Sequence, residues 1–123
     1  MNKHIIRFLL MVTMLLTMLP AMASAADGDT FGEGDFTYKV LSESDATVEV
    51  KINDSSISGD IEIPSTVTHN DKTYNVTAIS KEGFRGCSNL TSITIPDSVT
   101  SIGNSAFQTC QGLTSVRFLR NTQ

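Results

Sequence analysis

The sequence predicts a mainly β fold: a solenoid of stacked units of about 23 residues, preceded by an N-terminal β-hairpin. Two observations carry this prediction. The second half of the chain repeats itself at a fixed spacing, and the segment before it alternates apolar and polar residues. A repeat of this length is typical of solenoids, in which each unit contacts only its neighbours. No stretch of residues 26–123 keeps a helical period.

The repeat lies in residues 76–118. Most apolar positions of residues 76–95 return at one constant offset, either unchanged or as another apolar residue. Phe84 returns as Phe107 and Leu90 as Leu113. An irregular earlier copy at residues 60–67 matches residues 92–99 at a longer offset, and the extra residues fall in a polar insertion that we expect to form a short hairpin. One unit cannot enclose a core, so the units must stack.

Each unit contains a short strand followed by a coil. Alternation in the strands turns one set of side chains inward: Ile61, Ile63, Ile93, Ile95, Val116 and Phe118. Pro96 should end its strand, since proline has no N–H for the ladder. We expect Gly103 to adopt a backbone conformation closed to other residues, and residues 105–110 to form a short turn of helix on the far side.

The N-terminus has the order of a secretory signal over residues 1–25. Lys3 and Arg7 precede an apolar run at residues 8–19, and small residues follow. The run is too short to span a bilayer, which needs about 20 residues. Cleavage is predicted before Ala26, with a cut after Ala23 left open. We therefore expect an exported protein, secreted or at the cell surface, with no stable membrane span after signal removal.

Residues 26–35 are predicted to be a flexible leader, because they contain three glycines and four acids. Residues 36–58 are predicted to be a hairpin segment: strands at 36–41 and 47–52 are joined by a polar connection, and turn-forming residues follow. Residues 59–123 are assigned to the repeats.

Composition excludes several functions. Residues 26–123 carry 13 acidic and 7 basic side chains, a net charge of −6, whereas a nucleic-acid binder normally carries a basic stripe. The chain has no Trp and two Tyr, too few for a large aromatic platform that stacks on sugars. A domain of this size is also small for an enzyme with a deep pocket.

The run from Ile79 to Leu113 gives the repeat its signature, in which isoleucine and glycine are followed by Ala-Phe, Cys, Leu-Thr-Ser-Ile-x-Ile-Pro and Ser-Val. In this it resembles the BspA-like leucine-rich repeat family, and the resemblance covers about residues 59–118. It implies a surface or secreted protein of a host-associated bacterium. It also implies adhesion to host matrix proteins or to another bacterial surface protein.

Few side chains indicate chemistry. Cys87 and Cys110 occupy the same repeat position and are predicted to be stacked buried thiols, with a disulfide as the alternative. His69 lies in the polar insertion and has no partners that would form a catalytic set. Acidic residues near position 60 lack calcium-loop spacing. No catalytic residue, metal or cofactor is predicted.

The remaining candidate is the outward face of the short strands. Its polar side chains are expected to form two columns across the sheet: Asp60, Ser92 and Ser115 in one, and Glu62, Thr94 and Arg117 in the other. Solenoids bind ligands across such extended faces. The alternative is an ordinary solvated strand face.

These observations predict an exported, non-enzymatic repeat protein that recognises a protein ligand or mediates adhesion at the cell surface. The alternatives are an extracellular carbohydrate-binding module and a non-functional fragment of a longer repeat protein. Only about two and a half repeats are present, so we expect the last strand, around residues 114–118, to be exposed. Such an edge favours self-association by pairing with another chain.

Overall fold

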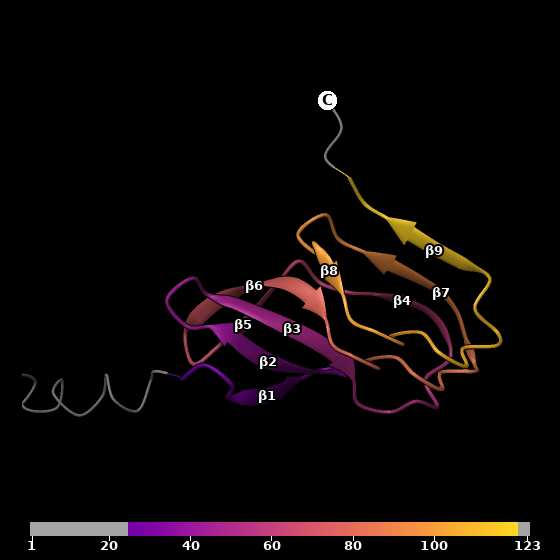
Figure 1. The fold of residues 1–123 in the computed structure, drawn as a ribbon, viewed down its shortest axis with the longest axis horizontal. Coiled ribbons are helices and arrows are strands. Elements are labelled where there is room, and N and C mark those ends of the chain that lie inside the picture. The colour runs from indigo at the N-terminus through magenta and orange to yellow at the C-terminus, as the bar shows by residue number, and fades with distance from the viewer. Residues whose placement is uncertain (1–24, 121–123) are drawn as a thin grey trace, which may run out of the picture.

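The computed structural model describes residues 25–120, which form nine strands in two sheets (Figure 1). The strands are β1 (Thr30–Glu33), β2 (Phe36–Ser42), β3 (Thr47–Ile52), β4 (Gly59–Glu62), β5 (Thr66–His69), β6 (Lys72–Ile79), β7 (Leu90–Ile95), β8 (Ser101–Ile102) and β9 (Ser115–Phe118). One sheet has the order β1-β2-β3-β6-β5, with β8 also paired to β6, and the other has the order β4-β7-β9.

The predicted signal at residues 1–25 lies outside the described residues except for Ala25. Within the part of the chain that the structure describes, no helix has the length and apolar character to cross a membrane.

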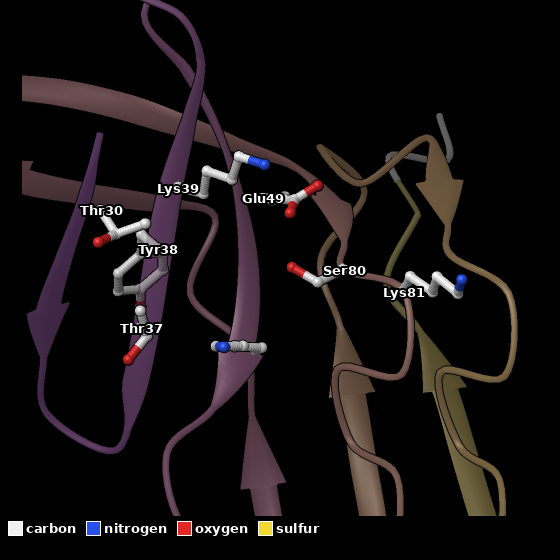
Figure 2. A pocket seen from close by; sticks show the side chains of 8 residues that line it. Thr30, Thr37, Tyr38, Lys39, Glu49, Ser80 and Lys81 are labelled. Atoms are coloured by element: carbon white, nitrogen blue, oxygen red, sulfur yellow. The ribbon is translucent and has the colours of Figure 1, made fainter. Parts of the chain in front are cut away.

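The predicted hairpin of residues 36–58 is confirmed: β2 and β3 pair antiparallel. Alternation places Val48 and Val50 in the core, where both are fully buried. On the opposite face, Lys39 and Glu49 are cross-strand partners and lie side by side (Figure 2). The period of two in the sequence therefore separates a buried face from a charged face.

The prediction of a flexible leader over residues 26–35 is wrong for Thr30–Glu33, which form β1 on the edge of the larger sheet. Phe31 accounts for the difference. It is 9% exposed, and its ring stacks on Tyr38 with the two centroids 5.5 Å apart. Burying one aromatic side chain offsets part of the cost of ordering a short strand, and the ladder to β2 adds to it.

The polar insertion forms the expected hairpin. β5 and β6 pair antiparallel from Thr66 opposite Asn75 to His69 opposite Lys72. The two connecting residues, Asn70 and Asp71, both have positive φ angles (52° and 64°). Two-residue hairpin turns of this kind favour Asn and Asp at these positions.

The repeats stack on two sides of the coil. On one side β4, β7 and β9 run parallel, with Ile61, Ile93 and Val116 in register, as the two sequence offsets between the copies require. On the other side β3, β6 and β8 are parallel, with Val50, Ile79 and Ile102 in register. Through β3, the N-terminal hairpin thus forms one layer of the stack (a rung), ahead of the first repeat.

The far side of the coil is held by backbone hydrogen bonds between repeats. Phe84 N donates to Ala106 O, and Gly86 N donates to Gln108 O, both at 2.8 Å. Residues 104–109 form successive turns, in which Ala106 N donates to Gly103 O, rather than the expected turn of helix. The backbone groups of these turns form hydrogen bonds with the neighbouring repeat, whereas in a helix they would form them within the same segment.

Gly103 does not have the positive φ that the sequence suggested. It is required for a different reason. A Cβ at this position would lie 2.4 Å from Lys81 N and 2.6 Å from Lys81 Cα. The two coils approach each other so closely here that only glycine fits.

Burial declines along the stack. Ile79 is 2% exposed, whereas the equivalent Ile102 is 43% exposed; Ile93 is 1% exposed, whereas the equivalent Val116 is 41% exposed. Phe118 is 49% exposed. The predicted exposure of the last strand is therefore confirmed, because no further rung in the described residues covers β9.

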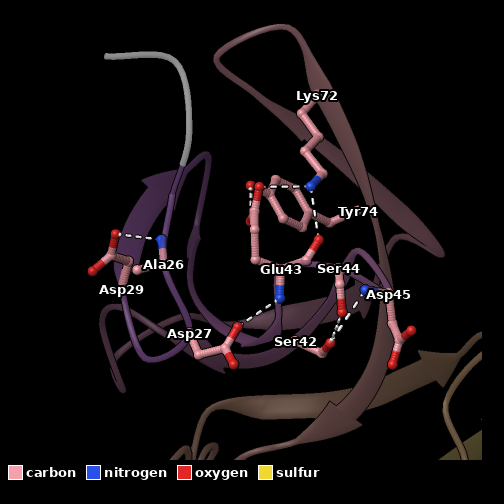
Figure 3. Close-up of polar contacts among 9 residues, drawn as sticks. All are labelled: Ala26, Asp27, Asp29, Ser42, Glu43, Ser44, Asp45, Lys72 and Tyr74. Atoms are coloured by element: carbon pink, nitrogen blue, oxygen red, sulfur yellow. Dashed lines mark hydrogen bonds and ion pairs between the residues drawn. The ribbon is translucent and has the colours of Figure 1, made fainter. Parts of the chain in front are cut away.

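A polar network joins the N-terminal hairpin to the insertion (Figure 3). Glu43, in the β2–β3 turn, accepts hydrogen bonds from Lys72 Nζ at 2.6 Å and from the Tyr74 hydroxyl at 2.9 Å. The hydrogen bond from Lys72 lowers the pKa of Glu43. The pKa of Tyr74 is raised to about 12, mainly by burial and to a smaller extent by its hydrogen bond to Glu43. The carboxylate is therefore held in its charged form between two donors.

We predict that Glu43→Gln reduces the acid sensitivity of the fold. Because the folded-state pKa of Glu43 lies below the usual 4.5, its contribution is present above that value and is lost as the pH falls through the lower, folded-state pKa. Thermal unfolding between about pH 5 and about pH 3 should show a smaller fall in Tm for the variant than for the wild type. Lys72→Met should reduce the fall in Tm over the same pH range to a similar extent. A fall in Tm equal to that of the wild type in both variants would contradict the network.

Candidate functional site

The smaller sheet brings all six predicted face residues together. Strand register places Asp60, Ser92 and Ser115 in one row, and Glu62, Thr94 and Arg117 in the next. The central Ser92 and Thr94 are half-buried, and the four flanking residues are exposed. Neighbouring strands, and hence successive members of each row, lie about 4.8 Å apart.

The face is polar and asymmetric in charge. Ser92 Oγ donates to Asp60 Oδ1 at 2.6 Å, and the Thr91 hydroxyl lies 3.3 Å from the same oxygen. Asp60 is thus a fixed acceptor, while the β9 edge carries the guanidinium of Arg117. A ligand across the sheet would meet carboxylates at one edge, hydroxyls in the middle and a cation at the other edge.

The inward-facing residues support this surface as predicted. Ile61, Ile63, Ile93 and Ile95 are buried in one hydrophobic cluster. Val116 and Phe118 share their register but remain exposed. β4 and β7 therefore have a packed underside, and β9 does not.

The two cysteines are free thiols, in agreement with the favoured prediction. Cys87 is buried and Cys110 is half-buried; the Cys110 thiol donates to Phe84 O at 3.0 Å. Burial is the main cause that raises the pKa of Cys87 to about 11. A thiol that stays protonated at neutral pH is a poor nucleophile.

We predict that alkylation separates the two thiols. In the folded chain Cys87 should stay unmodified, because it is buried and its thiol stays protonated, whereas the thiolate is the reactive form. Cys110 is half-buried and should react slowly, because access to it is limited. In denaturant without reductant both should react, giving two adducts by intact mass. Failure of both to react until reductant is added would instead indicate a disulfide.

His69 and Asp54 have structural contacts. The ring of His69 stacks on Phe31, with centroids 4.1 Å apart and planes inclined by 3°. Asp54 accepts hydrogen bonds from the backbone and hydroxyl of Ser56, which close a turn and lower the pKa of this carboxyl. Among residues 25–120, no three His, Cys, Asp or Glu side chains cluster as metal ligands.

One feature was missed from the sequence. A depression of about 320 Å³ lies on the outer face of the larger sheet, and Lys39, Lys51, Lys81, Glu49 and Ser80 contribute to its lining. The alternation of β2 and β3 places Lys39 and Lys51 on one face, which was a usable signal. The approach of Lys81 depends on the stacking of the coil and had no local signal.

The stacked parallel strands and far-side turns define a solenoid repeat protein. The family described as "BspA type Leucine rich repeat region (6 copies)" matches residues 51–123. The chain belongs to this family of leucine-rich repeat proteins, which confirms the resemblance read from the repeat signature. The comparison with curated proteins found no match.

Three solved structures are similar to this chain. A leucine rich cell surface protein from Faecalibacterium prausnitzii A2-165 shares 31% identity with a TM-score of 0.66, over 76% of this chain and 24% of that one. A leucine-rich repeat protein from Bacteroides capillosus ATCC 29799 shares 35% identity with a TM-score of 0.64, over 72% and 64% of the two chains. A leucine-rich repeat protein from Bacteroides ovatus ATCC 8483 shares 34% with a TM-score of 0.63, over 70% and 22%. This chain thus spans about a quarter of the length of the first of them.

Proposed function

We propose that this chain is an exported, non-enzymatic surface protein whose repeat sheet recognises a protein ligand and mediates adhesion. The observation that carries the proposal is the alignment of six polar side chains in two rows on β4, β7 and β9. The name of the similar Faecalibacterium protein, a cell surface protein, and the signal-like N-terminus support the location.

Recognition on this face requires no chemical step. The half-buried Ser92 and Thr94 place hydroxyl groups at its centre, and Asp60 and Arg117 supply opposite charges at its two edges. A protein partner with the complementary order of charges would be oriented across the sheet. Affinity would come from the area covered and from hydrogen bonds that replace those to water.

The test places a long charged side chain at the centre of the face. Thr94→Arg should weaken binding to immobilised extracellular-matrix proteins, or to whole bacterial cells, by about tenfold or more, because a central clash costs more than a change at the rim. Thr73→Arg, on an exposed position of β6, is the matched control. Equal binding by both variants and the wild type would exclude the repeat sheet as the recognition surface.

We also propose that residues 26–123 self-associate through β9, the strand with uncovered apolar side chains. The occupant is a second copy paired antiparallel. Pairing centred on Val116 places the two Val116 side chains opposite each other, and Ser115 opposite the second copy's Arg117. Pairing centred on Arg117 would set two like charges opposite each other, which is destabilising.

This pairing predicts a dimer by light scattering, and Val116→Lys should convert it to a monomer because the new charge would lie in the joined apolar surface. Leu41→Lys is the matched control, since Leu41 is 40% exposed and Val116 is 41% exposed. A monodisperse wild-type monomer at high concentration would contradict the pairing.

A further inference from the structure

The depression on the larger sheet lies where the N-terminal hairpin meets the first repeat (Figure 2). Lys39 and Glu49 come from β2 and β3, whereas Ser80 and Lys81 directly follow β6. The volume of about 320 Å³ is at the small end of the range for sites that hold small molecules. This site is on a different sheet from the proposed protein-recognition face.

The lining is cationic in an acidic chain. Lys39, Lys51 and Lys81 are three of the seven basic residues in residues 26–123, which carry a net charge of −6. The ion pairs among the described residues are Lys72–Glu43 and Arg85–Glu82, so these three ammonium groups have no carboxylate within ion-pair distance there. Three cations against the single carboxylate of Glu49 favour a ligand with negative charge.

Ser80 adds a fixed polar group. It is 8% exposed and is the one buried polar residue in the described part of the chain. Its hydroxyl makes no hydrogen bond among those residues, and Figure 2 shows it directed toward Glu49. Its backbone is held at both ends: Ser80 N donates to Val50 O at 3.0 Å, and Gly83 N donates to Ser80 O at 2.9 Å.

The combination of groups narrows the ligand class. Lysines alone would suit any anion, but Glu49 would repel a simple phosphate or sulfate. A carboxylate is useful where the ligand also offers hydroxyl donors. Neutral sugars usually need an aromatic face, and Tyr38, beneath the depression, is 1% exposed. A sugar bound here must therefore be held by charge.

We propose that this depression binds an acidic saccharide, with its carboxylate or sulfate group at Lys39 and Lys51 and its hydroxyl groups at Glu49 and Ser80. Lys81 extends the positive potential along the outer edge. Binding should weaken as salt is raised, since the attraction is partly between exposed charges.

Calorimetry on residues 26–123, which contain every strand of the structure, tests the proposal with three probes: a sulfated heparin tetrasaccharide, an oligogalacturonate and a neutral cello-oligosaccharide. Binding of either acidic probe, with no binding of the neutral one, is expected. The stronger of the two shows whether sulfate or carboxylate is preferred. Absence of binding by both acidic probes would overturn the proposal.

Matched double variants test whether Lys39 and Lys51 bind the acidic group of the saccharide. Lys39→Gln with Lys51→Gln should weaken the acidic probe by at least about tenfold, as for the loss of charge-assisted hydrogen bonds. Arg85→Gln with Arg120→Gln changes the net charge equally at exposed positions outside the depression and should leave binding unchanged. Equal loss in both doubles would mean that overall charge, and not this depression, attracts the ligand.

The affinity of the Glu49→Gln variant shows whether the ligand is bound as a saccharide or as a simple anion. The glutamine keeps one carbonyl acceptor but loses the charge-assisted hydrogen bonds from saccharide hydroxyls, so a saccharide should bind about tenfold more weakly, whereas tighter binding would overturn the saccharide assignment. Ser80→Ala should weaken binding to a smaller extent. An aspartate-rich peptide that binds more tightly than either acidic saccharide would also overturn the assignment. Urea midpoints unchanged from the wild type confirm that each variant is folded.

Discussion

Gly103→Ala is expected to destabilise the fold by about 3 kcal/mol or more, since adding atoms to a packed site commonly costs about 1–3 kcal/mol and this contact is with backbone. The new Cβ would lie 2.4 Å from Lys81 N. A clash with a side chain can be relieved by a rotamer change, but here one coil of the solenoid must move away from the next. A domain of this size has a total stability of only about 5–15 kcal/mol.

Urea unfolding measures this effect as a lower midpoint with an unchanged slope. Gly32→Ala is the control. Its added Cβ would have Phe36 O as nearest neighbour at 3.9 Å, and glycine in a strand is slightly unfavourable in any case. The control should therefore unfold at or slightly above the wild-type midpoint. A wild-type midpoint for Gly103→Ala would show that the two coils are further apart in solution.

Phe84→Ala is expected to cost about 3–5 kcal/mol, the usual range for deleting a buried phenyl group. Phe84 is 0% exposed. It packs edge-on against Phe36 with centroids 6.3 Å apart, and stacks on Phe107 at 5.5 Å. The variant therefore loses contacts to both the N-terminal hairpin and the second repeat, and the stack between them is interrupted.

Phe107→Ala provides the comparison, because Phe107 occupies the same repeat position but is only partly buried. Its truncation should cost clearly less than that of Phe84 in the same urea experiment. Equal costs would contradict the decline in burial from Phe84 to Phe107.

Most of the fold was predictable because repeat spacing and strand alternation determine register. The constant offset between the repeats aligns Ser92 with Ser115, and the alternation in β7 then decides which side chains face outward. The β7 and β9 members of the candidate face followed from these two rules, and Asp60 and Glu62 followed from the longer offset of the irregular copy. The polar insertion was recognisable as a hairpin because it interrupts an otherwise regular spacing.

The remaining features depend on contacts between distant segments. β1 forms because Phe31 contacts Tyr38 and Tyr74, although its neighbours in sequence are glycines and acids. Gly103 was recognised as a special position, but its cause is the approach of Lys81 rather than its own φ. The lysine-lined depression likewise needs the coil after β6 to reach the outer face of β3, and single-sequence patterns do not encode that approach.

The declining burial along the stack has a mechanical consequence. A force that pulls on residue 120 loads β9 first, and among residues 25–120 β9 has β7 as its one neighbouring strand. At the other end, β3 lies between β2 and β6. Under load the described part of the solenoid, residues 25–120, should therefore yield from β9 toward the hairpin, one repeat at a time. Each released repeat would add roughly 80 Å of extended chain, so the molecule would lengthen in steps while its N-terminal part stayed folded.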